Sequence, residues 1–273
     1  MSSYPPPHRA VIMARGLGTR MRKAAEGVDL AADQQAAADA GVKAMISVGR
    51  PFLDHVISDL ADAGYDDICL VIGPEHQVIS DYYDSVATER VRVSYAIQAE
   101  PLGTANAVAA AAEFAGDDRV LVVNSDNHYP GEAVAQLAEA PGGATLGFDR
   151  EALIAGSNIP RERVAAFALL QRDQSNRLTR IVEKPDAATI EELGDSALVS
   201  MNCWLLTPVM VAACATVGLS ARGEYELVDA VREAMEAGEE VIVVPVQAGV
   251  LDMSNRGDIG EVADRLRGRE PRL

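Results

Sequence analysis

Short apolar runs alternate with helix-like stretches along the first 130 residues, and this alternation restricts the fold more than any other feature. Two stretches have helical patterns, Pro51–Gly64 and Gly103–Gly116, and the first opens with proline and ends at glycine. Strands that alternate with helices predict parallel strand pairing, with helices on both faces of the sheet. The runs that we predict as strands are Ala10–Ala14, Ile68–Ile72, Val91–Ile97 and Val120–Val123, the last continuing into Asn124.

The second half of the chain has a different pattern. Residues 162–185 contain two strand-like runs around the polar turn DQSN, which predicts an antiparallel, hairpin-like extension. After it we expect a strand in ALVSMNCWLLTP, a helix in VMVAACATVG, an amphipathic helix in GEYELVDAVREAMEAGEE, a strand at Val241–Val246 and a last helix from Ser254 to near Arg267. The predicted fold class is therefore α/β, with a Rossmann-like mixed, mostly parallel sheet, helices on both faces and a small antiparallel extension. No linker-like segment separates the halves, so we expect a single domain over residues 1–273, with halves at about 8–130 and 131–262.

Positive charge is scarce in this chain but concentrated near its start. The sequence has 41 acidic and 24 basic side chains, a formal net charge of −17, which argues against nucleic acid or an anionic membrane as the main partner. Yet Arg15, Arg20, Arg22 and Lys23 fall in one short stretch with two glycines and no acid. Glycines after a buried strand let backbone N–H groups approach an anion closely, and a following helix would direct its positive end toward it. The stretch therefore indicates phosphate binding, with a purely structural turn as the alternative.

Better-known glycine motifs do not fit this stretch. A dinucleotide fingerprint needs a third glycine where Met21 stands, and the phosphate loop of many ATPases needs Gly-Lys-Ser/Thr. The three cysteines, Cys69, Cys203 and Cys214, are far apart, which fits neither a zinc site nor a disulfide framework. We expect buried free thiols and a cytoplasmic location. We find no apolar run long enough for a membrane span and no signal peptide.

Eight segments together resemble the sugar-1-phosphate nucleotidyltransferases, also called nucleotide-sugar pyrophosphorylases. In chain order they are AVIMARGLGTRMRK, VKAMISVGRPFLDHVI, QAEPLGTANAV, VLVVNSDNHY, IVEKP, SMNCWLLTP, GEYELVDAV and VLDMSNRGDI. They extend over residues 8 to 262, nearly the whole chain. Each motif alone is weak evidence, but eight in the family's order are strong evidence.

The resemblance implies a GT-A-like nucleotidyltransferase fold, with a nucleotide-binding first half and a sugar-phosphate-binding second half. The implied reaction is in-line attack of a sugar 1-phosphate oxygen on the α-phosphorus of a nucleoside triphosphate, which expels pyrophosphate with the help of Mg²⁺. Such transfers need alignment and neutralised charge more than covalent help. No hexapeptide repeat is present, so we expect no β-helix domain and no acetyl transfer. The sequence leaves homo-oligomer formation open.

The resemblance also assigns roles to individual residues. It implies catalytic roles for the cations Arg20, Lys43 and Lys184. The expected nucleotide-binding residues are Ala14, Gly16, Leu17, Gly18, Thr19, Arg20, Gln98, Pro101, Gly103 and Thr104. The expected sugar-phosphate-binding residues are Asn127, Glu183, Lys184 and Asn202. The expected Mg²⁺ ligands are Asp126 and Asp252.

The chemistry of these residue types agrees with the roles. Asp126 follows a buried strand at the carboxyl edge of the predicted sheet, where α/β proteins bind ligands, although a helix cap or turn acid is the alternative. Mg²⁺ takes one or two carboxylates and completes its shell with phosphate oxygens and water. Arg20 can bind phosphate oxygens bidentately. Gln98 offers both a donor and an acceptor, as a uracil or thymine edge requires, so UTP is the preferred nucleotide.

The chain also departs from the family pattern. Lys23 and Ala25 stand where the family has Pro and Thr, Val42 stands where it has Pro before Lys43, and an Ala-rich segment at 24–42 is inserted between them. We expect a helix there that ends near Gly41, either a lid or a surface helix. Arg15 replaces a small residue, and Ala166-Phe167-Ala168 replaces Tyr-Gly, so the sugar is not specified.

Two other functions stay open at this point. The same fold could use CTP and a non-sugar phosphomonoester, such as phosphocholine or a polyol phosphate. A non-catalytic nucleotide sensor is the third hypothesis, and retention of both Asp126 and Asp252 speaks against it.

Overall fold

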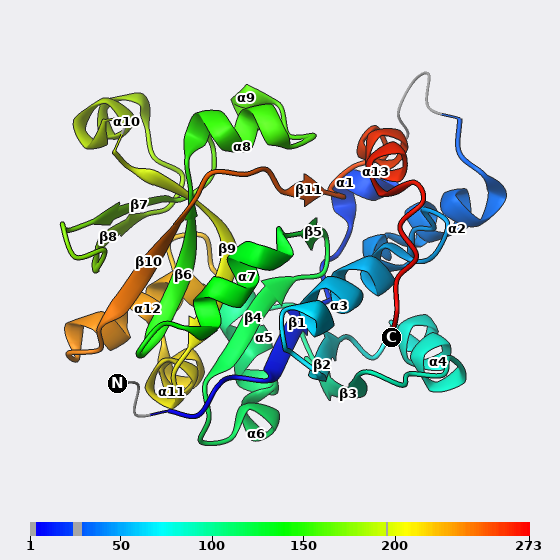
Figure 1. Ribbon diagram of the computed structural model, residues 1–273, viewed down its shortest axis with the longest axis horizontal. Coiled ribbons are helices and arrows are strands. Elements are labelled where there is room, and N and C mark those ends of the chain that lie inside the picture. Colours follow the sequence, from blue (N-terminus) through cyan, green and yellow to red (C-terminus); the bar gives the residue numbers. More distant parts are fainter. Residues whose placement is uncertain (1–3, 24–28, 195) are drawn as a thin grey trace.

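One mixed sheet runs through the whole molecule (Figure 1). The computed structural model describes residues 4–23, 29–194 and 196–273. The strand order is β10-β6-β9-β4-β1-β2-β3, and β7 pairs with β9 and with β8 beside this row. The strands are β1 (Arg9–Met13), β2 (Asp67–Ile72), β3 (Arg92–Ile97), β4 (Val120–Asn124), β6 (Gly143–Phe148), β7 (Leu169–Arg172), β8 (Leu178–Val182), β9 (Leu198–Leu206) and β10 (Val241–Val246).

The first half of this sheet is parallel, as the alternating pattern predicted. β1 pairs in parallel with β2 and β4, and β2 pairs in parallel with β3. β9 runs antiparallel between β4 and β6, and β10 joins β6 in parallel. The predicted antiparallel hairpin is present as β7 and β8. The sheet is therefore mixed and mostly parallel, with the antiparallel extension in the second half of the chain.

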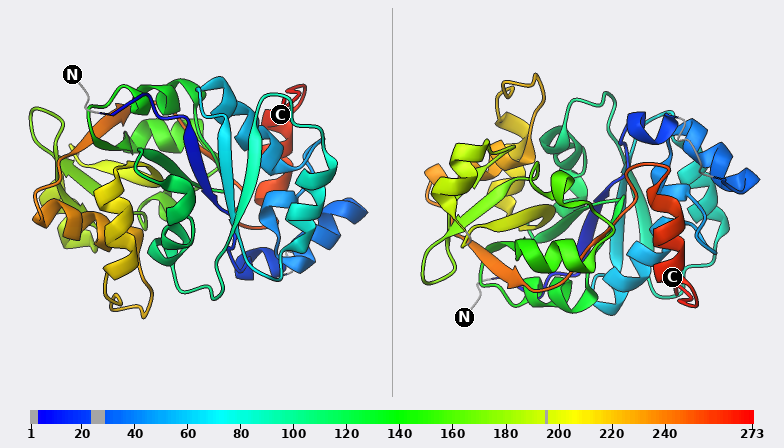
Figure 2. Two further views of the ribbon diagram at one scale, coloured as in Figure 1. Left: turned by 90° about the horizontal axis from the view of Figure 1, so that it is seen from below. Right: turned by 90° about the horizontal axis from the view of Figure 1, so that it is seen from above.

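Helices cover both faces of the sheet, and each face has its own apolar core (Figure 2). Alternating residues of β1 show the division, because Ala10 and Ile12 belong to one core and Val11 to the other. One core contains residues of α3 (Phe52–Asp62), α4 (Gln77–Ser85), α7 (Gly131–Ala138), α8 (Arg150–Gly156) and α13 (Asp258–Leu266). The other contains residues of α5 (Thr104–Ala110), α6 (Ala112–Ala115), α11 (Pro208–Thr216) and α12 (Leu227–Glu236).

Some helix boundaries differ from the sequence prediction. The helix expected over 103–116 is two helices, because the backbone leaves helical geometry at Ala111 between α5 and α6. The helix expected from GEYEL onward begins only at Leu227. Residues 223–226 instead form a connecting segment that is hydrogen-bonded to the backbone of residues 102–105. α9 (Arg161–Val164) precedes the hairpin, and α10 (Ala187–Leu193) follows it.

The Ala-rich segment contains α2 (Ala32–Ala40), which ends at Gly41 with φ near +74°, as a glycine stop predicts. Residues 24–28 of this segment lie outside the described residues. A 3-10 turn, η1 (Lys43–Met45), follows and leads into α3.

Two short strands bring the end of the chain to the centre of the molecule. β5 (Asn127–His128) pairs antiparallel with β11 (Leu251–Asp252), so Asp252 lies opposite Asn127. The following residues approach the first helix, α1 (Thr19–Arg22), which lies near α13 in Figure 1. The buried Arg256 guanidinium holds this arrangement, because its Nε donates to the carbonyl of Met21 at 2.9 Å and its Nη2 pairs with Asp39.

The three cysteines are buried and free, as predicted. Across the described part of the chain, no helix combines the length and apolar character that crossing a membrane requires.

Candidate active site

A cavity of about 430 Å³ opens at the carboxyl ends of the parallel strands. Ala14 follows β1, Gln98 follows β3, and Asp126 follows β4, and all three line the cavity. This is the edge at which open α/β sheets bind ligands. Of the residues that we predicted for the nucleotide, all ten line this cavity: Ala14, Gly16, Leu17, Gly18, Thr19, Arg20, Gln98, Pro101, Gly103 and Thr104.

The glycine turn after β1 is built on a close backbone contact. Gly18 has φ near +60°, and a Cβ at this position would lie 2.6 Å from the Cα of Gly41, so a side chain is excluded there. Gly16 differs, because a Cβ built on it meets nothing within 4 Å. The helix predicted to follow the glycine turn is α1, which is only one helical turn long. The groups that can bind an anion here are therefore mainly the backbone amides of the glycine turn and the exposed Arg20.

Arg15 lies in this turn but acts within the protein. Its guanidinium is buried and bonds to both carboxylate oxygens of Glu75, at 3.1 and 3.2 Å. Its Nη1 also donates to the backbone carbonyl of Gln98. Arg15 lowers the pKa of Glu75, chiefly through this hydrogen bond. Arg15 therefore pairs with a carboxylate, and its contacts tie the glycine turn to the loop after β2, through Glu75, and to the end of β3, through Gln98.

The segment from Gln98 to Thr104 is held rigidly against the connection before α12. Gly103 has φ near +122° and packs so tightly that a Cβ would lie 2.9 Å from the backbone nitrogen of Tyr225. The Oγ1 of Thr104 accepts a hydrogen bond from the amide of Leu227 at 2.9 Å. The GEYEL motif thus fixes the conformation of this loop by close contact, and Glu224 of the motif lines the cavity.

Gln98 corrects one part of the sequence prediction. The side chain is buried, and its Nε2 already donates to the carbonyl of Gly103 at 3.1 Å and to the Oδ1 of Asn106 at 2.9 Å. An amide nitrogen has two hydrogens, so both donors are used inside the protein. Gln98 can present its carbonyl oxygen to a base, but not the donor that we expected.

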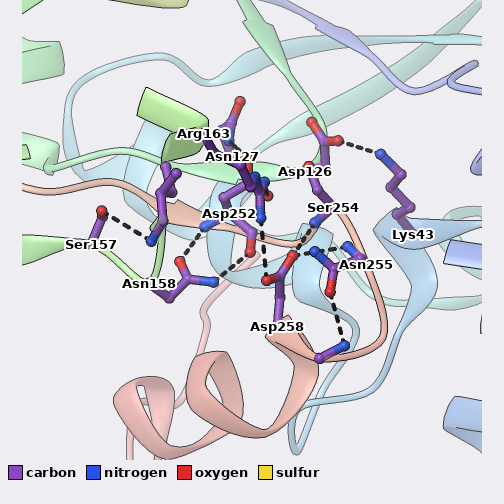
Figure 3. Close-up of polar contacts among 12 residues, drawn as sticks. Lys43, Asp126, Asn127, Ser157, Asn158, Arg163, Asp252, Ser254, Asn255 and Asp258 are labelled. Atoms are coloured by element: carbon purple, nitrogen blue, oxygen red, sulfur yellow. Dashed lines mark hydrogen bonds and ion pairs between the residues drawn. The ribbon is translucent and has the colours of Figure 1, made fainter. Parts of the chain in front are cut away.

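Lys43 and Asp126 form an ion pair in the cavity wall. The Nζ of Lys43 lies 2.7 Å from the Oδ2 of Asp126, and both side chains are mostly buried (Figure 3). The structure therefore brings together a predicted catalytic cation and a predicted metal ligand that are 83 residues apart.

Two of the residues predicted for the sugar phosphate, Asn202 and Lys184, lie at irregular points of the backbone. Asn202 interrupts β9 with φ near +54°, a conformation that asparagine tolerates better than most residues, and its side chain lines the cavity. Lys184 has φ near +45° just after β8 and is exposed. Lys184, Glu183 and Asn127 are not among the residues that line the cavity. Burial raises the pKa of Glu183, although Arg222 opposes the shift.

Asp252 belongs to a segment that lies beside the segment of Asp126 in space, but Asp252 does not line the cavity. The amide of Met253 donates to the carbonyl of Asp126 at 2.8 Å, so the two segments are hydrogen-bonded neighbours. The Asp252 carboxylate is buried and pairs with Arg163 at 2.7 Å, and it accepts a bond from Asn127 at 3.3 Å (Figure 3).

The donor set fits a Mg²⁺ ion bound partly by substrate. The described residues contain no cluster of three or more His, Cys, Asp or Glu side chains of the kind that holds a metal by protein ligands alone. Asp126 and Asp252 sit on adjoining segments, and two carboxylates with phosphate oxygens and water are a normal Mg²⁺ shell. Each carboxylate has a cation partner in the structure, Lys43 or Arg163, that an ion would replace.

Several site residues were not assigned from the sequence. Asn124, Ser125 and Glu224 line the cavity, and all three lie inside motifs that we quoted, so motif membership was the available signal. Arg163 had no such signal, because it lies outside the quoted motifs on the four-residue helix α9.

Comparison with known proteins agrees with this geometry. The family model described as "Nucleotidyl transferase" matches residues 9–264. The chain is 26% identical over 262 residues to the UTP–glucose-1-phosphate uridylyltransferase AglF of Haloferax volcanii, covering 94% of this chain and 96% of that protein. It is 26% identical to a glucose-1-phosphate thymidylyltransferase of Streptomyces griseus, covering 93% of this chain and 64% of that protein.

The fold comparison gives the same result. A crystal structure of a UDP-glucose pyrophosphorylase complexed with UDP-glucose superposes with a TM-score of 0.74 at 16% identity, covering 97% of this chain and all of that one. This likeness shows the fold. With the family match over nearly the whole chain and six of the eight quoted motifs lining one cavity, the chain belongs to the sugar-1-phosphate nucleotidyltransferase family and is a nucleotidyltransferase enzyme.

Proposed function

We propose that the protein transfers the uridylyl group of UTP to a sugar 1-phosphate, releasing pyrophosphate and forming a UDP-sugar. In this reaction a phosphate oxygen of the sugar phosphate forms a bond to the α-phosphorus, and the bond from the α-phosphorus to the bridging oxygen of pyrophosphate breaks. The relative in Haloferax volcanii is named for this activity with glucose 1-phosphate, which makes glucose 1-phosphate the first sugar to test.

The observation that carries the proposal is the convergence of separate motifs on one cavity. The glycine turn, Lys43, the loop after Gln98, Asp126 and Asn202 come from distant parts of the sequence and line the same space of about 430 Å³. This volume is within the usual range for a small-molecule site. The lining includes the cations Arg20 and Lys43 and the backbone of the glycine turn, which suit phosphates, and Gln98 and Gly103, which suit a base.

The triphosphate is proposed to lie on the glycine turn. Open space beside Gly16 allows a phosphate to approach the backbone amides, and Arg20 can bind the outer phosphate oxygens bidentately. Lys43 adds a third positive group once it leaves Asp126. These groups align the α-phosphate and neutralise charge that develops on pyrophosphate as it leaves.

The base is proposed to contact Gln98 and the rigid loop at Gly103. Because the Gln98 nitrogen is already engaged, its oxygen acts as an acceptor toward the base. Uracil and thymine present N3–H as a donor at this edge, whereas N3 of cytosine is itself an acceptor. An accepting Gln98 oxygen suits UTP and dTTP, but because the cytosine N4 amino group is also a donor, the choice of UTP rests on the name of the first relative.

The sugar phosphate is proposed to bind beside Asn202, Glu183 and Lys184. Asn202 offers an amide to sugar hydroxyls from the cavity wall, and the exposed Lys184 offers a charge to the phosphate. A Mg²⁺ ion between Asp126, Asp252 and the phosphates would supply charge neutralisation and fix the α-phosphate when bound. The three buried free thiols support a cytoplasmic location for the enzyme.

A substrate panel tests the proposal and its alternatives. Purified protein is incubated with Mg²⁺, each of UTP, dTTP, CTP, GTP and ATP, and each of glucose 1-phosphate, N-acetylglucosamine 1-phosphate, phosphocholine and glycerol phosphate, and pyrophosphate is measured. We expect the highest rate with UTP and a sugar 1-phosphate. Turnover only with CTP and a non-sugar phosphate would replace the proposal by the cytidylyltransferase alternative. Nucleotide binding without pyrophosphate release from any pair would indicate a sensor.

A further inference from the structure

The carboxylate of Asp252 is already neutralised by a neighbouring arginine. Its Oδ1 lies 2.7 Å from the Nη2 of Arg163, and its side chain is only 6% exposed. The backbone around it is also fixed, because Asn158 donates to the carbonyl of Asp252 and accepts from its amide, both at 2.8 Å (Figure 3). Asp252 is therefore held on the Arg163 side and cannot turn freely toward Asp126.

Arg163 is held in place by a second acid. Its Nη1 lies 3.4 Å from the Oδ1 of Asp258, and the other oxygen of Asp258 accepts bonds from the amides of Ser254 and Asn255 at 2.9 and 2.8 Å. The Arg163 side chain is 24% exposed and so stays partly in contact with water.

Arg163 and a divalent ion compete for the same carboxylate. An ion that took Asp252 as a ligand would have to break a short, mostly buried ion pair and would then sit close to an arginine that keeps its charge. Both effects oppose metal binding, since removing one partner of a buried pair leaves an uncompensated charge and like charges at short range repel. Lys43 competes in the same way for Asp126, but the Asp126 side chain is 22% exposed and lines the cavity, whereas the Asp252 side chain is 6% exposed and does not.

We propose that Arg163 is a positioning residue that keeps Asp252 from acting as a metal ligand in the nucleotide-free enzyme, so that the divalent ion is bound there by Asp126 alone. The Asp252 carboxylate becomes available to the ion only when Arg163 leaves it and pairs instead with an anionic substrate that occupies the cavity. Weak metal binding without nucleotide follows. This inference rests on the proposed metal site at Asp126 and Asp252.

The test measures Mn²⁺ binding to nucleotide-free protein at pH 7.5, by electron paramagnetic resonance of the free ion or by calorimetry. Arg163→Met removes the competing charge at similar volume, and we expect the Mn²⁺ dissociation constant to fall on the order of tenfold. Arg161→Met is the matched control, because Arg161 lies on the same helix and pairs with the exposed Glu151 far outside the cavity lining. It removes one positive charge and should leave Mn²⁺ affinity within twofold of the wild type.

Asp252→Asn provides a second, independent measurement. On the wild-type background it should change Mn²⁺ affinity by less than threefold, and on the Arg163→Met background it should cancel the gain. Unchanged affinity in Arg163→Met would overturn the inference. If Arg163→Met does not fold, a tenfold loss of Mn²⁺ affinity in Asp252→Asn alone would also overturn the inference. Asp252 would then already be a metal ligand in the nucleotide-free protein.

Asp126→Asn separates this inference from the proposed function. Mn²⁺ binding that survives Asp126→Asn shows that the proposed metal site is wrong, and the inference falls with it. If Asp126→Asn abolishes binding while Arg163→Met binds like the wild type, the metal site stands and only the role of Arg163 is refuted.

Discussion

Replacing each of the two glycines of the turn by alanine should have a different effect. Gly18→Ala should lower the stability of the protein, whereas Gly16→Ala should weaken the binding of UTP. Gly18→Ala places a methyl group 2.6 Å from the Cα of Gly41 and forces a φ near +60° on a residue with a Cβ. The left-handed conformation costs about 1–2 kcal/mol, and displacing the backbone of Gly41 costs about 1–3 kcal/mol more. Since a domain of this size loses about 2–4 °C in Tm for each kcal/mol, we expect Gly18→Ala to lower Tm by roughly 4–20 °C.

Gly16→Ala is the matched control within the turn. A Cβ there meets no atom within 4 Å, so we expect a change in stability of at most about 0.5 kcal/mol. The added methyl group projects from a residue that lines the cavity and should hinder a phosphate from reaching the turn amides, so KM for UTP should rise about tenfold or more, roughly 1.4 kcal/mol of lost binding.

Thermal unfolding by circular dichroism and UTP saturation kinetics measure the two effects in both variants. The reasoning is refuted if Gly16→Ala destabilises the protein as much as Gly18→Ala does, or if Gly16→Ala leaves KM for UTP unchanged. The first result would refute the packing argument for the turn, and the second would mean that the turn does not hold the polyphosphate of UTP.

Three further predictions concern individual side chains. Arg20→Ala should lower both UTP affinity and turnover by about tenfold or more in binding and rate assays, whereas Arg22→Ala, on the same turn but outside the cavity lining, should change UTP affinity less than threefold. Gln98→Leu should lower kcat/KM for UTP by about tenfold, and an unchanged value would remove Gln98 from the base site. Glu183→Gln should raise Tm at pH 7.5 while lowering turnover. The pKa of Glu183 is raised in the folded protein, so the native state disfavours its charged form. The contribution of Glu183 to stability is therefore present at low pH and is lost as pH rises. The Tm gain should therefore shrink toward pH 4, and a gain that grows toward pH 4 would contradict this sign.

Much of the fold was predictable because its signals are local. Parallel strands buried on both faces are continuous apolar runs, and β1, β2, β3 and β4 lie within one residue of the predicted segments. Proline and glycine marked the ends of α3 in the same local way. The break between α5 and α6 was missed because an alanine-rich stretch gives no local reason to leave the helix, and its ends are fixed by packing.

The site was less completely predictable, since side-chain partners depend on tertiary structure. The motifs identified the residues that surround the cavity, but no sequence pattern shows that the Gln98 nitrogen is used inside the protein. The pairing of Arg163 with Asp252 joins residues 89 apart, and α9 carries two arginines, Arg161 and Arg163, that look alike in sequence. Only the approach of β11 to β5 distinguishes Arg163 from the exposed Arg161.

The most direct test of the central claim is a crystal structure of the protein soaked with UDP-glucose and Mg²⁺. The account predicts a diphosphate on the turn at Gly16–Thr19, the uracil beside Gln98 and Gly103, and the glucose beside Asn202. A nucleotide bound elsewhere, with this cavity empty, would contradict the claim that the separate motifs form one site for nucleotidyl transfer.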